Sequence, residues 1–264
     1  MSPSLKILYL GDIVGRPARE FIGDRMRSIR TLNGIDVVIA NAENVTSGSG
    51  INREHAEFLH GNGVDIITLG DHVWDRRGFE CDIAHLDYVC RPANIPDECP
   101  GRDFAMMEKN GIKVGVSVVL GRHFMKIDAT CPVRAMENIL RKRGNSVDIF
   151  IAEIHAEATA EKIAFGWNFD GRVAAIIGTH THVPTADDRI LPNGTAYVTD
   201  IGMCGPHASV IGRDISQVLQ SIKYGMPQKF EVATDDVRLN GVLLTIDAAS
   251  GLARKISRFS ERMA

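Results

Sequence analysis

The sequence has no excess of charge of either sign and no long apolar run. Its 264 residues include 30 basic and 33 acidic side chains, for a net charge of −3 with histidine neutral. This balance gives no general basic field for nucleic acid, although it allows a local basic groove. No apolar stretch approaches the roughly 20 residues that span a bilayer, and the first residues lack the pattern of a secretory signal. We therefore expect a cytoplasmic protein with no membrane partner.

Cysteine is scarce, and no two cysteines form a Cys-x-x-Cys pair. The nine-residue spacing of Cys81, Cys90 and Cys99 leaves a zinc site as an alternative, but such sites usually begin with a tighter pair. We expect free thiols, including those of Cys131 and Cys204. Internal repeats, low-complexity tracts and linkers rich in Pro, Gly or Ser are also lacking, which favours one domain over residues 1–264.

Short runs rich in valine and isoleucine alternate with segments of helical length. The runs predict strands at residues 5–10, 36–40, 64–69, 113–119, 147–154, 173–177, 196–199 and 241–246, and the segments between them predict helices at 16–32, 52–62, 132–143 and 159–167. Such apolar runs are typical of strands covered on both faces. The alternation predicts a layered α/β fold.

Metal-type side chains follow five of the predicted strands. They are Asp12, Glu43, Asn44, Asp71, His155, His180 and His182. A single polar residue at a strand end is most often a turn former. Five strands with the same pattern favour a site, because the carboxyl ends of strands in an α/β sheet open onto a shared crevice. Imidazole and carboxylate ligands without cysteine suit Mn, Fe or Zn.

The number of candidate ligands indicates two metal ions. Seven donors exceed what one catalytic ion with an open position needs. A turn after the strand would let His180 and His182 face two adjacent ions. A bridging carboxylate between ions roughly 3.5–4 Å apart gives the arrangement that activates water and clamps a phosphoryl group.

The same residues lie in motifs that resemble those of the bacterial YmdB-like metallophosphoesterases. The motifs are GDIVG at 11–15, NAEN at 41–44, GDHVWD at 70–75, HAEAT at 155–159, GTHTHV at 178–183 and YVTDIGM at 197–203. The resemblance implies a calcineurin-like α/β sandwich of two mixed β-sheets flanked by helices. It also implies phosphodiester hydrolysis at a dinuclear centre, with cyclic nucleotides among the substrates of relatives.

The family pattern also implies a role for each ligand. Glu43 would bridge two divalent or mixed-valence ions, iron or manganese first and zinc as an alternative. The other ligands would be Asp12, Asn44 and His182 for the first ion and Asp71, His155 and His180 for the second. The wider superfamily usually has a histidine where this chain has Val14, and Asn44 would fill that vacancy.

Asp71 departs from the asparagine that the family usually has before the histidine of its third motif. An ionised aspartate still ligates a metal, and adjacent cations would keep its pKa low. The additional negative charge predicts tighter metal retention and weaker attraction for a phosphate anion. As an alternative, a neighbouring cation such as Arg16 or Lys162 would offset this charge and give the opposite outcome.

His72 is the predicted general acid, with a structural histidine in a turn as the alternative. A metal-bridging hydroxide would attack phosphorus, and His72 would protonate the leaving alkoxide. We therefore expect a homo-oligomeric phosphodiesterase that hydrolyses 2′,3′- or 3′,5′-cyclic nucleotides or related phosphodiesters, RNA ends included. A phosphomonoesterase with the same metals and a low-turnover regulatory binding protein are the alternatives.

Acidic residues near a predicted helix start allow two interpretations. Glu157 and Glu161 lie where acidic side chains often just complement the helix dipole. Glu157 has a second interpretation, in which it orients a ligating histidine. The first interpretation is preferred at this stage.

Overall fold

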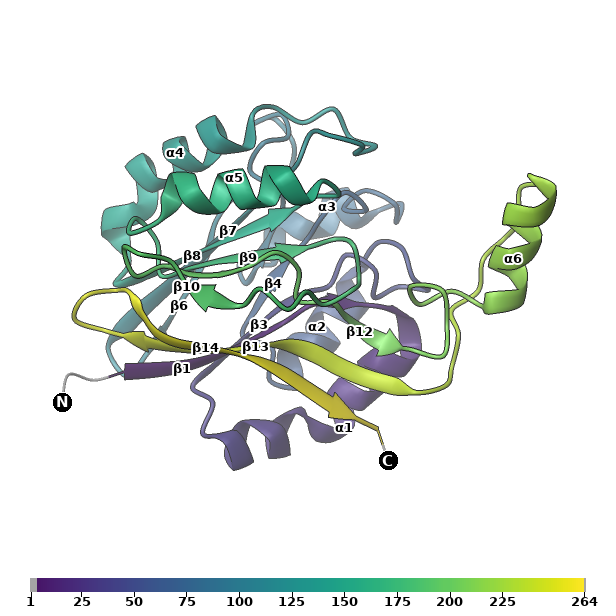
Figure 1. The fold of residues 1–264 in the computed structure, drawn as a ribbon, viewed down its shortest axis with the longest axis horizontal. Coiled ribbons are helices and arrows are strands. Elements are labelled where there is room, and N and C mark those ends of the chain that lie inside the picture. The colour runs from purple at the N-terminus through teal and green to yellow at the C-terminus, as the bar shows by residue number, and fades with distance from the viewer. Residues whose placement is uncertain (1–3, 264) are drawn as a thin grey trace.

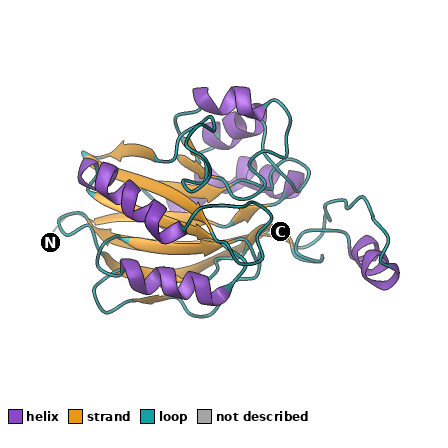
Figure 2. Ribbon diagram, turned by 90° about the horizontal axis from the view of Figure 1, so that it is seen from above, coloured by secondary structure: helices purple, strands orange, loops and turns teal. Residues whose placement is uncertain are grey.

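Two β-sheets packed face to face form the centre of the structure, and helices cover both outer faces (Figures 1 and 2). The computed structural model describes residues 4–263. Both sheets combine parallel and antiparallel strands, so the predicted α/β sandwich of two mixed sheets is confirmed. The layered arrangement follows from the sequence, because each apolar strand is covered on both faces.

The first sheet has eight strands in the order β2-β12-β13-β1-β3-β4-β5, with β14 paired to β13. They are β1 (Ser4–Leu10), β2 (Asp12–Ile13), β3 (Val37–Asn41), β4 (Ile66–Thr68), β5 (Val89–Cys90), β12 (Met203–Pro206), β13 (Val237–Asp247) and β14 (Ala253–Arg262). Strands β1, β3, β4 and β5 run parallel, whereas β13 is antiparallel to both β1 and β14.

The second sheet has six strands in the order β10-β11-β9-β8-β7-β6. They are β6 (Ala105–Lys109), β7 (Ile112–Leu120), β8 (Ile149–His155), β9 (Ala175–Thr179), β10 (Arg189–Ile190) and β11 (Ala196–Val198). Its central strands β7, β8, β9 and β11 are parallel. One apolar cluster joins the sheets, with Ile7 and Ile39 from the first beside Val116 and Ile151 from the second.

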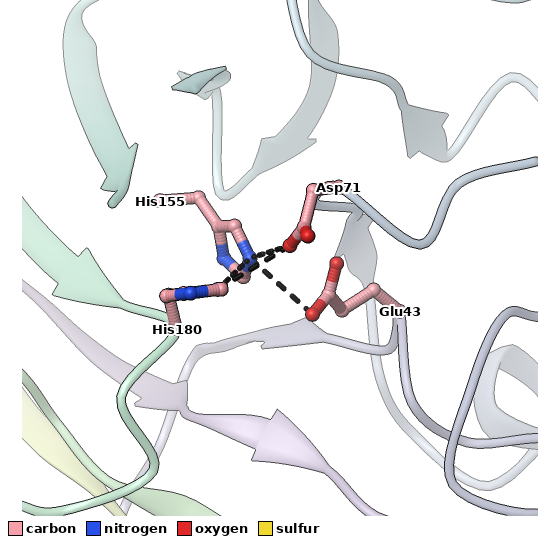
Figure 3. Close-up of side chains that lie close together, drawn as sticks. All are labelled: Glu43, Asp71, His155 and His180. Atoms are coloured by element: carbon pink, nitrogen blue, oxygen red, sulfur yellow. Dashed lines mark hydrogen bonds and ion pairs between the residues drawn. The ribbon is translucent and has the colours of Figure 1, made fainter. Parts of the chain in front are cut away.

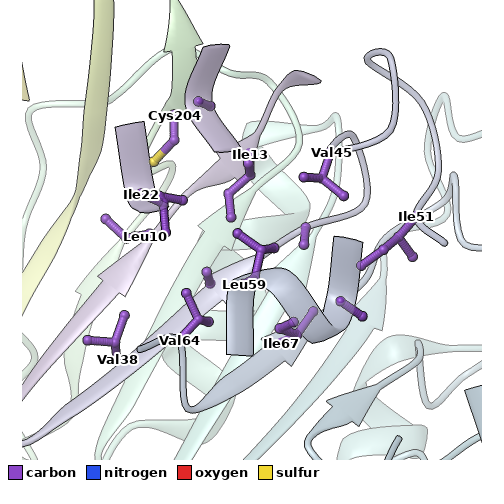
Figure 4. Packing of buried hydrophobic residues seen from close by; sticks show 14 of the residues in the cluster. Leu10, Ile13, Ile22, Val38, Val45, Ile51, Leu59, Val64, Ile67 and Cys204 are labelled. Atoms are coloured by element: carbon purple, nitrogen blue, oxygen red, sulfur yellow. The ribbon is translucent and has the colours of Figure 1, made fainter. Parts of the chain in front are cut away.

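Helices complete the sandwich on its outer faces (Figures 1 and 2). On the first sheet, α1 (Gly15–Asn33) and α2 (Arg53–Gly61) pack residues such as Ile22 and Leu59 against Val38 (Figure 4). On the second, α4 (Pro132–Arg143) and α5 (Thr159–Phe169) pack Ile139 and Phe165 against the strands. The remaining helices are short α3 (Phe79–Asp82) and α6 (Ile215–Tyr224), with 3₁₀ turns at Ile83–His85 and Gly144–Ser146.

Most predicted elements have the predicted positions. The helix at 132–143 begins and ends at the predicted residues, and the other predicted helices shift by one or two residues at their ends. The elements that were not predicted are β2, β5, β6, β10, β12, β14, α3 and α6. Strand β14 and helix α6 have no buried residue and so lack the apolar run that marks an internal element, whereas the others are only two to five residues long. In the described part of the chain no helix is both long and apolar enough to cross a bilayer. The five cysteines are free, as predicted.

Candidate metal centre

The candidate ligands lie at the ends of parallel strands from both sheets. Asp12 follows β1, Glu43 follows β3 and Asp71 follows β4 in the first sheet, whereas His155 ends β8 and His180 follows β9 in the second. These five strands run in two parallel sets, so their carboxyl ends lie at one edge of the sandwich. The fold thereby brings together donors that are far apart in sequence.

Four of the seven candidates form a compact donor group. One ligand atom from each of Glu43, Asp71, His155 and His180 lies within 4.8 Å of the others (Figure 3). Nε2 of His155 is 3.1 Å from Oδ1 of Asp71 and 3.3 Å from Oε1 of Glu43. Nδ1 of His180 is 3.1 Å from that same Nε2 and 3.3 Å from Oδ1 of Asp71.

The other three candidates surround Glu43 and His180. The side-chain amide of Asn44 lies 3.0 Å from Oε1 of Glu43 and 3.2 Å from Nε2 of His182. Oδ2 of Asp12 accepts a hydrogen bond of 3.2 Å from the backbone N–H of His180. Oε1 of Glu43 thus contacts both His155 and the side-chain amide of Asn44.

A left-handed turn separates the two histidines of the fifth motif. His180 has a φ of 95° and His182 a φ of 66°, values that non-glycine residues adopt only where their surroundings hold them. His180 faces Asp71 and His155, whereas Nδ1 of His182 lies 3.0 Å from the backbone carbonyl of Ile211. The two rings therefore face different neighbours.

The chemistry of the donor set fits divalent cations. Among the buried side-chain nitrogen and oxygen atoms of residues 4–263, only Oδ1 of Asp12 has no hydrogen-bond partner. Burial raises the pKa of the Asp12 carboxyl to about 7, since the lowering by His155 is smaller and Glu43 raises it further. A buried carboxylate with one oxygen unpartnered, beside other carboxylates, is costly unless a cation compensates it.

Asp71 obtains its compensation from histidine and not from the cations that the sequence suggested. Burial would raise its pKa, but hydrogen bonds from His155 and His180 outweigh burial and hold that pKa below the usual range. The alternative in which Arg16 or Lys162 offsets this charge does not hold. Arg16 pairs with Glu20 at 2.6 Å, and Lys162 pairs with Asp200 at 2.8 Å.

His72 lies beside the donor group, and Asp75 holds its ring. Its backbone N–H donates to Oε2 of Glu43 at 3.0 Å. Its Nδ1 lies 2.7 Å from Oδ2 of Asp75, which leaves Nε2 free. The ring lines a cavity of about 280 Å³ together with Glu43, Asn44, His180 and His182. A proton donor at the wall of such a cavity can reach a bound substrate.

Three acidic residues support the site in ways that sequence reasoning missed or ranked second. Glu153 is buried and accepts hydrogen bonds from Tyr9 at 2.5 Å, Asn41 at 2.7 Å and Thr179 at 2.6 Å. The hydroxyl of Thr179 also lies 2.9 Å from Nδ1 of His155, so this ring is fixed from behind. An acidic residue inside a buried apolar strand is the sequence signal that would have marked Glu153.

Asp200 and Glu157 hold the histidines of the turn. Oδ2 of Asp200 accepts from the N–H and hydroxyl of Thr181, at 3.1 and 2.7 Å, while it pairs with buried Lys162. Oε2 of Glu157 lies 3.2 Å from Nε2 of His180, so the geometry favours its orienting interpretation over the helix-dipole one. Glu161 accepts instead from the backbone N–H groups of Arg122 and His123.

Gly70 makes room for the donors. A Cβ at this position would lie 2.2 Å from Oε2 of Glu43 and 2.3 Å from Nε2 of His155. No side chain fits in that space, so the backbone of the third motif must approach the donor group as glycine.

The fold and the donor set define a metal-dependent phosphoesterase of the calcineurin-like type. The YmdB-like protein family matches residues 8–259, and the chain belongs to this family. Its relatives span bacteria of several kinds. The 2′,3′-cyclic-nucleotide 2′-phosphodiesterase of Bacillus subtilis (strain 168) is 38% identical over 254 residues, which cover 96% of this chain and 96% of the relative.

Solved structures share the fold over the whole chain. A phosphatase of Mycoplasma pneumoniae has a TM-score of 0.91 at 36% identity, with 99% of this chain and 95% of that one covered. A hypothetical protein of Thermus thermophilus has a TM-score of 0.92 at 35% identity, with 98% and 100% covered. The NAD nucleotidase of Haemophilus influenzae, at 12% identity and a TM-score of 0.54, shares the fold over 99% of this chain and 50% of its own.

Proposed function

We propose that this protein is a dinuclear metal-dependent phosphodiesterase that opens 2′,3′-cyclic nucleotides, with 3′,5′-cyclic nucleotides as a further substrate class. The position of Glu43 carries the proposal, because its Oε1 lies 3.3 Å from His155 and 3.0 Å from Asn44, which itself lies beside His182. The activity in the name of the B. subtilis relative supports the substrate class.

The residues at the site would divide into two ligand sets around Glu43. Asp12, Asn44 and His182 would hold one ion, and Asp71, His155 and His180 the other. Iron or manganese suits this imidazole and carboxylate set, and zinc is compatible with it. Two such ions supply a nucleophile by lowering the pKa of bound water, and they neutralise phosphoryl charge.

A residue of the protein would then supply the proton that the leaving oxygen needs. As water oxygen bonds to phosphorus, the bond between phosphorus and one ribose oxygen breaks, and that oxygen needs a proton. His72 can donate it from Nε2, since Nδ1 is held by Asp75. The product keeps its phosphate on the other ribose oxygen.

A basic cavity next to the site supports substrates with additional phosphates, such as RNA ends. It has a volume of about 810 Å³, and its wall includes Arg16, Arg19, Arg76, Arg213 and Lys229. Arg76 and Arg213 donate to backbone carbonyls of the loop at residues 46–49. Arg213 also lines the cavity of the donor group, so the two cavities are neighbours.

The test is a paired assay of metal-loaded protein. Loading with Fe, Mn and Zn in turn, followed by metal analysis, would give the stoichiometry and the preferred ion. We expect two ions per chain and hydrolysis of 2′,3′-cyclic nucleotides, with faster turnover of bis-p-nitrophenyl phosphate than of p-nitrophenyl phosphate. Faster turnover of the monoester would favour a phosphomonoesterase, and absent turnover with both ions bound would favour a regulatory binding protein.

A further inference from the structure

Helix α6 projects from the body of the protein on an arm between β12 and β13 (Figures 1 and 2). We define the arm as residues 212–233. Hydrogen bonds close its base, from the N–H of Asp214 to the carbonyl of Glu231 at 3.0 Å and from the N–H of Ala233 to that of Gly212 at 3.0 Å. None of the residues of α6 is buried.

The arm carries several exposed apolar side chains. Ile215, Leu219 and Ile222 are exposed by 45, 56 and 76%, and they lie on one face of α6 at helical spacing. Tyr224, the last residue of α6, and Met226 beyond it are exposed by 58 and 54%. A contiguous apolar surface of this kind marks an interaction site.

Helix α6 is capped at both ends but is too short to be stable in isolation. Oδ1 of Asp214 accepts from the N–H of Gln217 at 3.0 Å as an N-cap, and Gly225 ends the helix with a φ of 65°. A helix shorter than about 12 residues is marginal in water unless its apolar face is packed. The ten residues of α6 therefore need a partner surface.

The sequence of α6 is nearly symmetric about its centre. The ten residues from Asp214 to Lys223 are D-I-S-Q-V-L-Q-S-I-K, and they read alike from both ends. Isoleucine matches isoleucine, serine matches serine, glutamine matches glutamine, and valine matches leucine. The two ends differ only in charge, with an acid at one and a base at the other.

We propose that α6 pairs antiparallel with α6 of a second copy of this chain, around a two-fold axis between Val218 and Leu219. In that arrangement Ile215 lies opposite the partner's Ile222, and Val218 lies opposite the partner's Leu219. Asp214 lies opposite the partner's Lys223, and the symmetry makes this ion pair twice. The apolar face of one helix thus packs against the same face of its partner, and the acid at one end of each helix pairs with the base at the end of the other.

Other occupants fit this helix less well. A helix that lies on a membrane usually has a polar face rich in lysine and arginine, whereas that of α6 consists mainly of serine and glutamine. A helix of this length is about 15 Å long, and a standard interface covers about 800 Å² per partner. Tyr224, Met226 and Phe230 extend the surface toward that size.

Sedimentation velocity over a wide concentration range tests the pairing. We expect a concentration-dependent dimer for the full chain. Leu219→Glu should raise the dissociation constant by about 30-fold or more, because the substitution enters the centre of the interface twice. Leu32→Glu is the control, since Leu32 is also an exposed leucine, at 80% against 56% for Leu219, but lies near the end of α1. Equal thermal unfolding of the variants would show that each protomer stays folded.

A charge cycle tests the antiparallel direction. Lys223→Glu should weaken the dimer at low salt, because Glu would face the partner's Asp214. Adding Asp214→Asn keeps the cap and removes that repulsion, so the double variant should bind more tightly than Lys223→Glu alone. Within one helix these two residues lie about 13 Å apart, beyond the screening length at physiological salt. A monomer at every concentration, a dimer insensitive to Leu219→Glu, or strictly additive charge effects would overturn the proposal.

Discussion

Nδ1 of His72 lies 2.7 Å from Oδ2 of Asp75, and this contact fixes which ring nitrogen faces the cavity. The two residues lie three positions apart in the third motif, so one turn of chain contains both the proposed acid and the group that orients it. The sequence motif alone gives no role to Asp75, whereas the structure places it where it can orient the ring of His72.

Replacing Asp75 with Asn should slow turnover while metal content stays the same. The amide keeps the size of the side chain but no longer favours one ring orientation by charge. We expect a loss of about 10-fold to 100-fold on a 2′,3′-cyclic nucleotide, measured by steady-state kinetics. Ser49→Ala is the control, because Ser49 contacts the same carboxylate without ionising. Loss of metal in Asp75→Asn would contradict the orienting role.

His72→Ala should retain metal and slow turnover by about 10²-fold to 10⁴-fold on substrates with poor leaving groups. The physical reason is that an alkoxide must be protonated as it leaves, whereas nitrophenolate leaves readily without a proton. The penalty on bis-p-nitrophenyl phosphate should therefore be much smaller. Equal penalties on both substrates would argue against His72 as the acid.

Glu43→Gln should lose much of the bound metal and nearly all hydrolysis. An amide cannot bind two cations as strongly as a carboxylate shared between them. Metal analysis after dialysis, together with activity, measures both effects. Two ions retained at full activity would sink the bridging assignment. Glu20→Gln, on the exposed face of α1, is the control for the loss of one carboxylate elsewhere.

Asp71→Asn should weaken metal retention and tighten phosphate inhibition. The amide oxygen can still coordinate, and the site gains one unit of positive charge. No compensating contact from Arg16 or Lys162 opposes this change, because both cations are paired elsewhere. Metal loss under chelator challenge and the inhibition constant for phosphate are the measurements. Unchanged phosphate affinity in fully loaded protein would refute the charge argument.

Glu153→Gln should lower the free energy of unfolding by about 1–3 kcal/mol, because the buried carboxylate accepts from three donors that an amide cannot all satisfy. Urea unfolding of metal-free protein measures this without contribution from ligand binding. Exposed Glu108 on β6 provides the control, and Glu108→Gln should change stability by less than about 0.5 kcal/mol. Equal stability of the two variants would show that the Glu153 network carries little energy.

The sequence by itself predicted the layered fold and gathered seven donors at strand ends. It could do so because strand periodicity is local and because parallel strands must end at a common edge. The same local reasoning could not find Glu153 or Asp200, which act on the histidines through contacts between distant strands. It also could not decide whether Arg16 or Lys162 compensates Asp71, since charge compensation depends on distance in space.

Tertiary structure decided how the donors divide and what remains uncovered. The left-handed turn at His180 and His182 directs two neighbouring rings to different groups, and backbone conformation of this kind depends on the packing around it. The near-symmetry of residues 214–223 around helix α6 is visible in the sequence itself. Only the fold shows that this segment projects from the body with its apolar face exposed. Whether a side chain is exposed depends on whether other parts of the chain pack over it, and the sequence alone does not show this.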